Sequence, residues 1–173
     1  MVERARARCP GLTFVEGDAE QLPFQDEAFD VATGAFVINH LPDPERAVAE
    51  LRRVARRVSL AMWAEDTPLF ALPTRAAQDA PIAGPDAERF ASRENLLALL
   101  PGEVTEVTFD LELDDFDALW DGLLGGTVRT AARLTEAHRE PLRALAEPYR
   151  KRNGYALPTA VRVVTACSGR PGP

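Results

Sequence analysis

The spacing of apolar residues predicts that strands and helices alternate through the first third of the chain. Short runs rich in β-formers predict strands at 12–17, 29–35 and 58–63. The run 29–35 is mostly apolar, which indicates a strand buried on both faces of a sheet. A helix from Pro44 to about Arg56 separates the last two strands. Strand, helix and strand in this order predict a right-handed parallel crossover and hence an α/β sheet.

The helix between these strands carries two independent signals. Asp43-Pro44 is typical of an N-cap followed by proline at the first helical position. One apolar stripe recurs at steps of three and four residues, through Ala47, Val48, Leu51, Val54 and Val58.

Proline, alanine and glycine dominate the residues from Thr67 to Asp86, and we expect a loop or small lid that no regular element crosses. Further on, Ser92 caps a helix that runs through Leu100, and period-two alternation predicts a strand over 107–113. The remaining signals are a helix from Asp114 or Asp115 to Gly125-Gly126, helix caps at Thr127 and Thr135, and a final strand at 160–167.

These signals divide the chain into four stretches. We expect residues 1–66 to form half of a ligand-binding domain, beginning with the end of a helix at Val2–Cys9. Residues 67–92 form the loop or lid, residues 93–168 the C-terminal part of the same domain, and residues 169–173 a tail. No internal repeat is present.

Composition narrows the possible partners. The chain has 173 residues, 46% of them hydrophobic, enough for one globular core. Its formal net charge of -7 argues against a nucleic-acid surface, which needs basic patches to displace counterions from phosphates. No apolar run approaches the roughly 20 residues that span a bilayer, no metal-ligand cluster stands out, and Cys9 and Cys167 have no redox-type spacing. We therefore expect a cytoplasmic protein with reduced thiols, no metal, no nucleic acid and no membrane.

The most specific motif lies near the start of the chain. It consists of Phe14-Val15-Glu16-Gly17-Asp18-Ala19-Glu20, Leu22-Pro23-Phe24, Phe29-Asp30-Val31, Gly34-Ala35-Phe36 and His40-Leu41-Pro42-Asp43. This sequence resembles class I S-adenosylmethionine-dependent methyltransferases of the type 11 group, in the branch of the quinone C-methylases. The resemblance implies an α/β fold: a Rossmann-like methyltransferase sheet, followed by a C-terminal helical and β segment.

The resemblance also implies site residues. In open α/β sheets, ligands bind beyond the carboxyl ends of the strands. By resemblance, Asp18 and Ala19 bind the adenine of S-adenosyl-L-methionine, and Gly34, Ala35 and Phe36 lie against its methionine part. A small residue such as Ala35 at a strand end is equally compatible with simple packing. Leu22-Pro23-Phe24 either covers the edge of the adenine or packs in the hydrophobic core.

His40 is the candidate catalytic residue. A histidine just beyond the second strand could take a proton from an acceptor hydroxyl, because its unperturbed pKa of about 6.5 allows either charge state near neutrality. By resemblance, the run that follows it also shapes the site and starts the next helix. Trp63, Trp120 and Phe90 either line an acceptor pocket or pack in the core.

Nothing in these residues corresponds to the first half of the family's cofactor domain. No G-x-G-x-G loop occurs, nor an acid for the ribose, and the sheet is expected to be incomplete, with the family's first two strands absent. Two functions follow. One is methyl transfer to a small-molecule acceptor, either by an enzyme of which this is an N-terminally incomplete chain or by one that a homo-oligomer or another polypeptide completes. The alternative is a non-catalytic scaffold or heteromeric partner.

Overall fold

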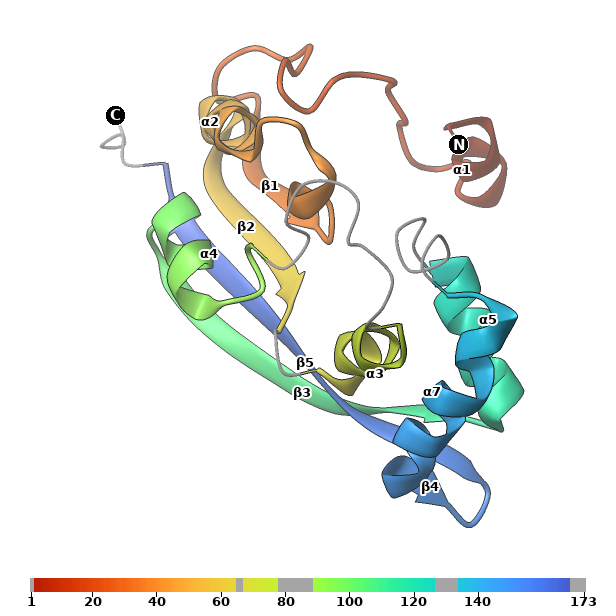
Figure 1. Cartoon of the computed structure of the whole chain (residues 1–173). Helices are drawn as coiled ribbons and strands as arrows, with labels where there is room; N and C mark the ends of the chain where they lie inside the picture. Colours follow the sequence, from red (N-terminus) through yellow and green to blue (C-terminus); the bar gives the residue numbers. More distant parts are fainter. Residues whose placement is uncertain (1, 65–66, 78–88, 127–133, 169–173) are drawn as a thin grey trace.

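The computed structural model describes residues 2–64, 67–77, 89–126 and 134–168. Its centre is one sheet with the strand order β1-β2-β5-β3, in which β4 pairs with β5 beside this path. β1 (Phe29–Ala35) and β2 (Ala55–Trp63) are parallel. β5 (Gly154–Cys167) runs antiparallel to both β2 and β3 (Glu103–Leu113). The sheet is therefore mixed, with one parallel pair at its edge (Figure 1).

Helix α2 (Pro44–Val54) connects the parallel strands, as the apolar stripe predicts. Asp43 Oδ1 accepts a hydrogen bond of 2.9 Å from Arg46 N, which confirms the predicted N-cap. Ala47, Val48 and Val54 are buried against the sheet. The β1–α2–β2 crossover is thus specified by local signals and by burial of one helix face.

The predicted strand at 12–17 is wrong. These residues form no β ladder, and Leu12 and Val15 are 64% and 52% exposed. The described pairing nearest to them is an isolated bridge between Asp18 and Gln21. A β-strand needs a neighbour for its backbone groups, and the described residues provide none here.

The predicted burial of β1 on both faces is also wrong. Phe29 and Val31 are 42% and 51% exposed, and β2 is the described strand that pairs with β1. An apolar run satisfies the pattern of an interior strand, but burial on two faces requires layers on both sides. In the described residues β1 is an edge strand.

The proline-rich stretch contains a helix that its composition did not predict. α3 (Pro68–Ala76) begins with Pro68 at a position where no backbone N–H is needed, and it accommodates Pro73 in its interior. The rest of the expected lid, residues 78–88, lies outside the described residues. α4 (Arg93–Leu99) follows, and Ser92 Oγ accepts from Asn95 N at 3.1 Å, which confirms that cap.

The C-terminal half forms a second group of elements. Besides β3 and β5, it contains α5 (Phe116–Gly126), the 3-10 helices η2 (Glu136–His138) and η3 (Glu147–Tyr149), α7 (Arg139–Ala146) and β4 (Arg150–Lys151). Thr135 caps η2 as predicted, while Thr127 and the tail 169–173 lie outside the described residues. At the other end of the chain, α1 (Val2–Arg8) buries none of its side chains.

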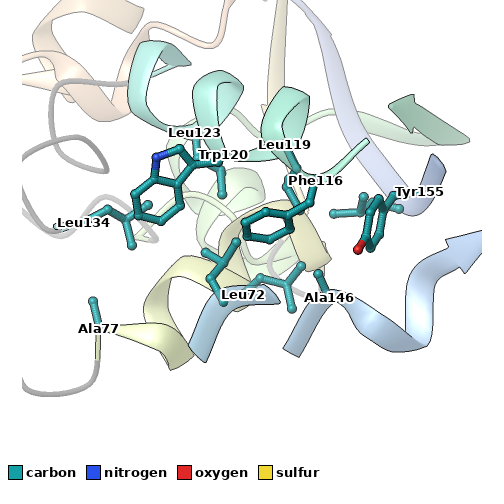
Figure 2. Close-up of a cluster of buried hydrophobic side chains, with 11 residues drawn as sticks. Leu72, Ala77, Phe116, Leu119, Trp120, Leu123, Leu134, Ala146 and Tyr155 are labelled. Carbon is teal, nitrogen blue, oxygen red and sulfur yellow. The ribbon is translucent and has the colours of Figure 1, made fainter. Parts of the chain in front are cut away.

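Two apolar clusters hold these elements together. One joins α2 and α4 to a single face of the sheet and contains Val48, Val58, Leu60, Leu96 and Val164. The other lies where α3, α5 and α7 gather at the far end of β3 and β5 (Figure 1). Figure 2 shows its side chains, among them Leu72, Phe116, Trp120 and Tyr155. Trp120 and Phe90 are 4% and 3% exposed, so both belong to the core.

A partly buried ion pair between Glu50 and Arg53 holds the loop before β1 against α2. Arg53 Nε and Nη2 donate to the two oxygens of Glu50 at 2.7 and 2.8 Å. Arg53 also donates to the carbonyls of Phe24 and Leu22 at 2.8 and 3.0 Å, and Leu22 N donates to Glu50 Oε2 at 2.8 Å. The hydrogen bond from Arg53 lowers the pKa of Glu50 from 4.5 to about 2.

We expect Glu50→Gln to lower the free energy of unfolding by about 1–2 kcal/mol, because it removes one charge from a bidentate pair. The stabilisation of the native chain by Glu50 is complete above pH 4.5 and is lost as the pH falls toward 2, since the folded-state pKa is depressed. Urea titrations at pH 7 and pH 3 measure both effects. Glu45→Gln, on the same helix but in an exposed pair with Arg89, should cost under about 1 kcal/mol; equal losses in the two variants would contradict this role.

Leu142→Ala should lower the free energy of unfolding by about 2–5 kcal/mol, because Leu142 is fully buried in the cluster of α3, α5 and α7. The matched control is Leu12→Ala, whose side chain is 64% exposed and whose loss should change stability by about 0.5 kcal/mol or less. Chemical denaturation followed by circular dichroism compares the two. A small effect of Leu142→Ala would show that this cluster contributes little to the fold.

Candidate functional site

The carboxyl end of β1 is held in an unusual backbone conformation. Phe36, the residue after the strand, has a φ of 56°, a region that bulky residues rarely adopt. Its N–H donates to Ala61 O at 2.8 Å, and its ring stacks on Trp63 with centroids 4.6 Å apart and planes at 29°. The backbone bond to β2 and the ring stack together fix this turn. Strain of this kind concentrates at functional sites.

Gly34 and Ala35 point to opposite faces of the sheet. Gly34 is buried, and a Cβ built there would lie 3.0 Å from Leu60 Cδ2 and 3.7 Å from Leu51 Cδ1. The missing side chain therefore makes room for core packing against α2. Ala35 is exposed. Of the two, Ala35 is the residue whose small side chain leaves an accessible surface at the strand end.

Asp18 and Ala19 form a tight turn. Asp18 Oδ1 accepts a hydrogen bond from Glu20 N at 2.9 Å, and Asp18 O accepts one from Gln21 N at 3.1 Å. The Asp18 side chain is exposed and Ala19 is half-buried. The turn thus presents a carboxylate to solvent from a fixed backbone.

This turn is attached to the start of α2. Asp43 N donates to Glu20 Oε1 at 2.8 Å, and Arg46 Nε donates to Glu20 O at 3.0 Å. Asp43 is only seven residues beyond Phe36, and the short η1 (Ile38–His40), anchored by the fully buried Ile38, lies between them. The loop from β1 to α2 is therefore the element that connects the two predicted halves of the site.

Sequence reasoning missed Glu20 and Arg46, which make this connection. The available signal was the acid two residues after Asp18, which the motif contains but to which no role was assigned. His40 ends η1 with an exposed side chain, and its N–H donates to Val37 O at 2.9 Å. Of the aromatic residues considered for an acceptor pocket, Trp63 lies at the site and is half-buried, whereas Trp120 and Phe90 lie in the core.

An open groove of about 620 Å³ begins at Ala64, the residue after β2, and extends toward β3. Neither Gly17 nor Gly34 lines it. Its polar lining includes Glu106, Asp110, Tyr149 and Arg162. Arg162 Nε donates to Glu106 Oε2 at 3.0 Å, so the charge of the arginine is balanced within the groove.

Two features are absent from the described residues. Among them, no group of three or more His, Cys, Asp or Glu side chains could hold a metal ion. In the same part of the chain, no helix has both the length and the apolar character needed to cross a bilayer.

Residues 1–61 match the family described as a methyltransferase domain. Phthiotriol/phenolphthiotriol dimycocerosates methyltransferase of Mycobacterium tuberculosis is 49% identical over 53 residues, which are 31% of this chain and 20% of that protein. The mitochondrial 2-methoxy-6-polyprenyl-1,4-benzoquinol methylase of Rattus norvegicus is 48% identical over 52 residues, 30% of this chain and 16% of that protein. The chain thus spans only 16–20% of the length of these relatives.

A solved structure extends the likeness to the whole chain. The crystal structure of a methyltransferase-type protein from Bacillus halodurans aligns with a TM-score of 0.59 and 18% identity, and the alignment covers 98% of this chain and 79% of that one. Residues 1–61 are thus similar to part of a methyltransferase domain. The family resemblance and the α/β methyltransferase fold expected from the sequence are confirmed. Ala35 and Phe36 lie at the carboxyl end of β1, the edge where open α/β sheets bind ligands.

Glu20→Ala should loosen the Asp18 turn, because it removes the acceptor for Asp43 N. We expect hydrogen exchange at Gln21 and Asp43 to become about 3- to 10-fold faster, corresponding to a loss of about 1 kcal/mol of local stability. Hydrogen exchange resolved by NMR measures this. Glu16→Ala, which changes an exposed acid four residues earlier, serves as the control; unchanged exchange in Glu20→Ala would show that the turn does not depend on this bond.

Proposed function

We propose that this chain forms one part of the site of an S-adenosylmethionine-dependent methyltransferase that acts on a small molecule. The observation that carries the proposal is the attachment of the Asp18 turn, through Glu20, to the segment that follows the strained end of β1. Two motifs far apart in the sequence are thereby fixed on one side of the fold. The matches to methyltransferases over residues 1–61 support the same reaction class.

The residues present fit the adenosyl group of this cofactor. An exposed carboxylate with one oxygen held by Glu20 N keeps acceptor capacity for an exocyclic amine. The half-buried Ala19 offers a backbone N–H beside it, and Ala35 and Phe36 offer a small and a flat surface for the methionine part. When bound, S-adenosylmethionine supplies an activated methyl group on its sulfonium.

His40 would take the acceptor's proton in this proposal. Its exposed side chain follows the end of β1 by five residues, and an imidazole can accept a proton. Alignment of the acceptor with the methyl group matters more than proton removal in such a transfer.

The affinity of this chain for the cofactor should be weak. The 173 residues contain no G-x-G-x-G loop, and losing two charge-assisted hydrogen bonds to the ribose would cost about two to four decades of affinity. We therefore propose that residues outside these 173 complete the site in the active enzyme, from the same polypeptide, another copy or a second polypeptide. The exposed outer edge of β1 favours the alternative, a non-catalytic scaffold, equally well.

Calorimetry with S-adenosylmethionine and with its demethylated product tests the proposal. We expect measurable heat at millimolar ligand, and Asp18→Ala should weaken binding by about 1.5–3 kcal/mol, roughly 10- to 150-fold, because a charge-assisted hydrogen bond is lost. Asp30→Ala removes an equally exposed carboxylate on β1 and should leave the affinity unchanged. No heat from the unmodified chain at millimolar ligand would favour the scaffold, and equal affinities of Asp18→Ala and the unmodified chain would show that Asp18 is only a turn residue.

A further inference from the structure

The Asp18 turn is not held in place by a paired strand before it. Residues 12–17, which lead into the turn, form no β ladder in the described part of the chain, and Val15 is 52% exposed. Arg6 Nη2 donates to Phe14 O at 2.8 Å, but α1, which carries this arginine, buries none of its side chains. A binding loop needs a rigid scaffold to position it. The position of this turn must therefore come from contacts made by the residues that follow Asp18.

The guanidinium of Arg53 holds the loop that follows the turn, and each of its N–H groups has an acceptor. Nε donates to Glu50 Oε1 at 2.7 Å, and Nη2 donates to Glu50 Oε2 at 2.8 Å and to Leu22 O at 3.0 Å. Nη1 donates to Phe24 O at 2.8 Å and to Asp26 Oδ1 at 3.0 Å. Arginine carries five N–H donors in one rigid plane. All five are used here, so the site requires the geometry of arginine as well as its charge.

Glu50 orients this guanidinium and binds the loop directly. Leu22 N donates to Glu50 Oε2 at 2.8 Å, so the backbone of Leu22 is held through both its N–H and its carbonyl. The backbone of α2 contributes as well, because Glu27 N donates to Arg53 O at 2.9 Å. The side chains of Glu50 and Arg53 are 19% and 31% exposed. Water therefore competes only in part for these charge-assisted bonds, which are stronger than neutral ones.

Pro23 connects this attachment to the Asp18 turn. It lies between the two residues whose carbonyls accept from Arg53. A Cβ built on Gly17 would lie 3.3 Å from Pro23 Cδ and 3.6 Å from Pro23 Cγ, so the proline ring packs directly over Gly17. Asp18 is the next residue, and its bridge to Gln21 closes the turn. The place of Pro23 thus determines where the chain enters the turn.

Helix α2 holds the turn and its loop at two points. Near the start of the helix, Arg46 Nε donates to Glu20 O at 3.0 Å. Near its end, Arg53 holds the loop, about 10 Å further along the helix axis. The helix itself is buried against β1 and β2. Two attachments to one rigid helix therefore fix the Asp18 turn relative to the end of β1.

We propose that Arg53 and Glu50 are positioning residues for an adenosyl group, which they place by fixing the loop after Asp18. This inference rests on the function proposed above and adds to it the residues that maintain the geometry of the turn. Neither residue belongs to the binding surface itself. Each acts through the backbone of Leu22–Phe24 and through Gly17, and residues 12–17 contribute little.

Hydrogen exchange in the absence of ligand tests the mechanical part of the proposal. Arg53→Lys keeps the charge but concentrates three donors on one nitrogen, so it cannot make all the bonds to the loop. We expect exchange at the Gln21 amide, which donates to Asp18 O, to become at least about 3-fold faster. Arg56→Lys is the matched control, because Arg56 is 62% exposed and pairs with Glu27 and Asp30 at 4.0 and 3.6 Å. Unchanged exchange in Arg53→Lys, or equal acceleration in both variants, would overturn the proposal.

Titration with S-adenosylhomocysteine, followed by NMR, tests the effect on binding. Arg53→Lys and Glu50→Gln should each weaken the affinity by about 3- to 10-fold, because the groups belong to one network. The amide shifts of Asp18 and Ala19 should shrink, while those at the end of β1 persist. A purely structural role would instead reduce the shifts of both segments together. Circular dichroism shows whether each variant still folds.

Val15→Ser distinguishes the two possible supports of the turn. It changes the segment before the turn and should leave the affinity for S-adenosylhomocysteine unchanged; a loss as large as that of Arg53→Lys would overturn the proposal. So would an unchanged affinity of Arg53→Lys when Asp18→Ala weakens binding, a result that leaves the proposed function standing. Absence of any shift in the unmodified chain would contradict the proposed function and the assignment to an adenosyl group, while exchange at Gln21 would still show whether Arg53 holds the turn.

Discussion

The parallel pairing of β1 with β2 is the constraint on which the rest of the structure depends. It sets Ala35 beside Ala61 and carries the hydrogen bond from Phe36 N to Ala61 O, so that the chain turns sharply and the Phe36 ring rests on Trp63. From that turn, η1 leads to the cap of α2, and the cap holds Glu20 and with it the Asp18 turn. Moving β1 by one residue would exchange the buried and exposed faces of the strand and separate every one of these contacts.

Two apolar clusters hold the sheet, one on each of its faces. Burial of α2 and α4 covers the face of Val58, Leu60 and Val164, and the Glu50–Arg53 pair fastens the loop before β1 to that layer. The far ends of β3 and β5 are held by a separate cluster around Phe116 and Leu72 (Figure 2). This second cluster packs on the face of Val107 through Tyr155 and Leu157, while Val107 itself is 49% exposed.

Much of the fold could be predicted from the sequence because local signals specified it. The Asp43 and Ser92 caps, the stripe of α2 and the alternation around Val107 each identify an element by its own residues. Errors arose where the outcome depends on neighbours: 12–17 has the composition of a strand but no partner, and 29–35 has the composition of an interior strand but lies at an edge. The contacts of Arg53 with the carbonyls of Leu22 and Phe24 could not be predicted, because they join α2 to a loop 31 and 29 residues away in sequence.

The candidate site follows the same division. The motif predicted which residues belong to the site. The contacts that attach them to one another are made by Glu20 and Arg46, and these contacts are visible only in the structure.

The central claim is that the Asp18 turn and the end of β1 act as one binding surface. NMR mapping of amide shifts during titration with S-adenosylhomocysteine tests it most directly. The account predicts that the amides of Asp18, Ala19, Ala35 and Phe36 shift together with a single dissociation constant; shifts confined to one of these two segments, or to neither, would contradict it.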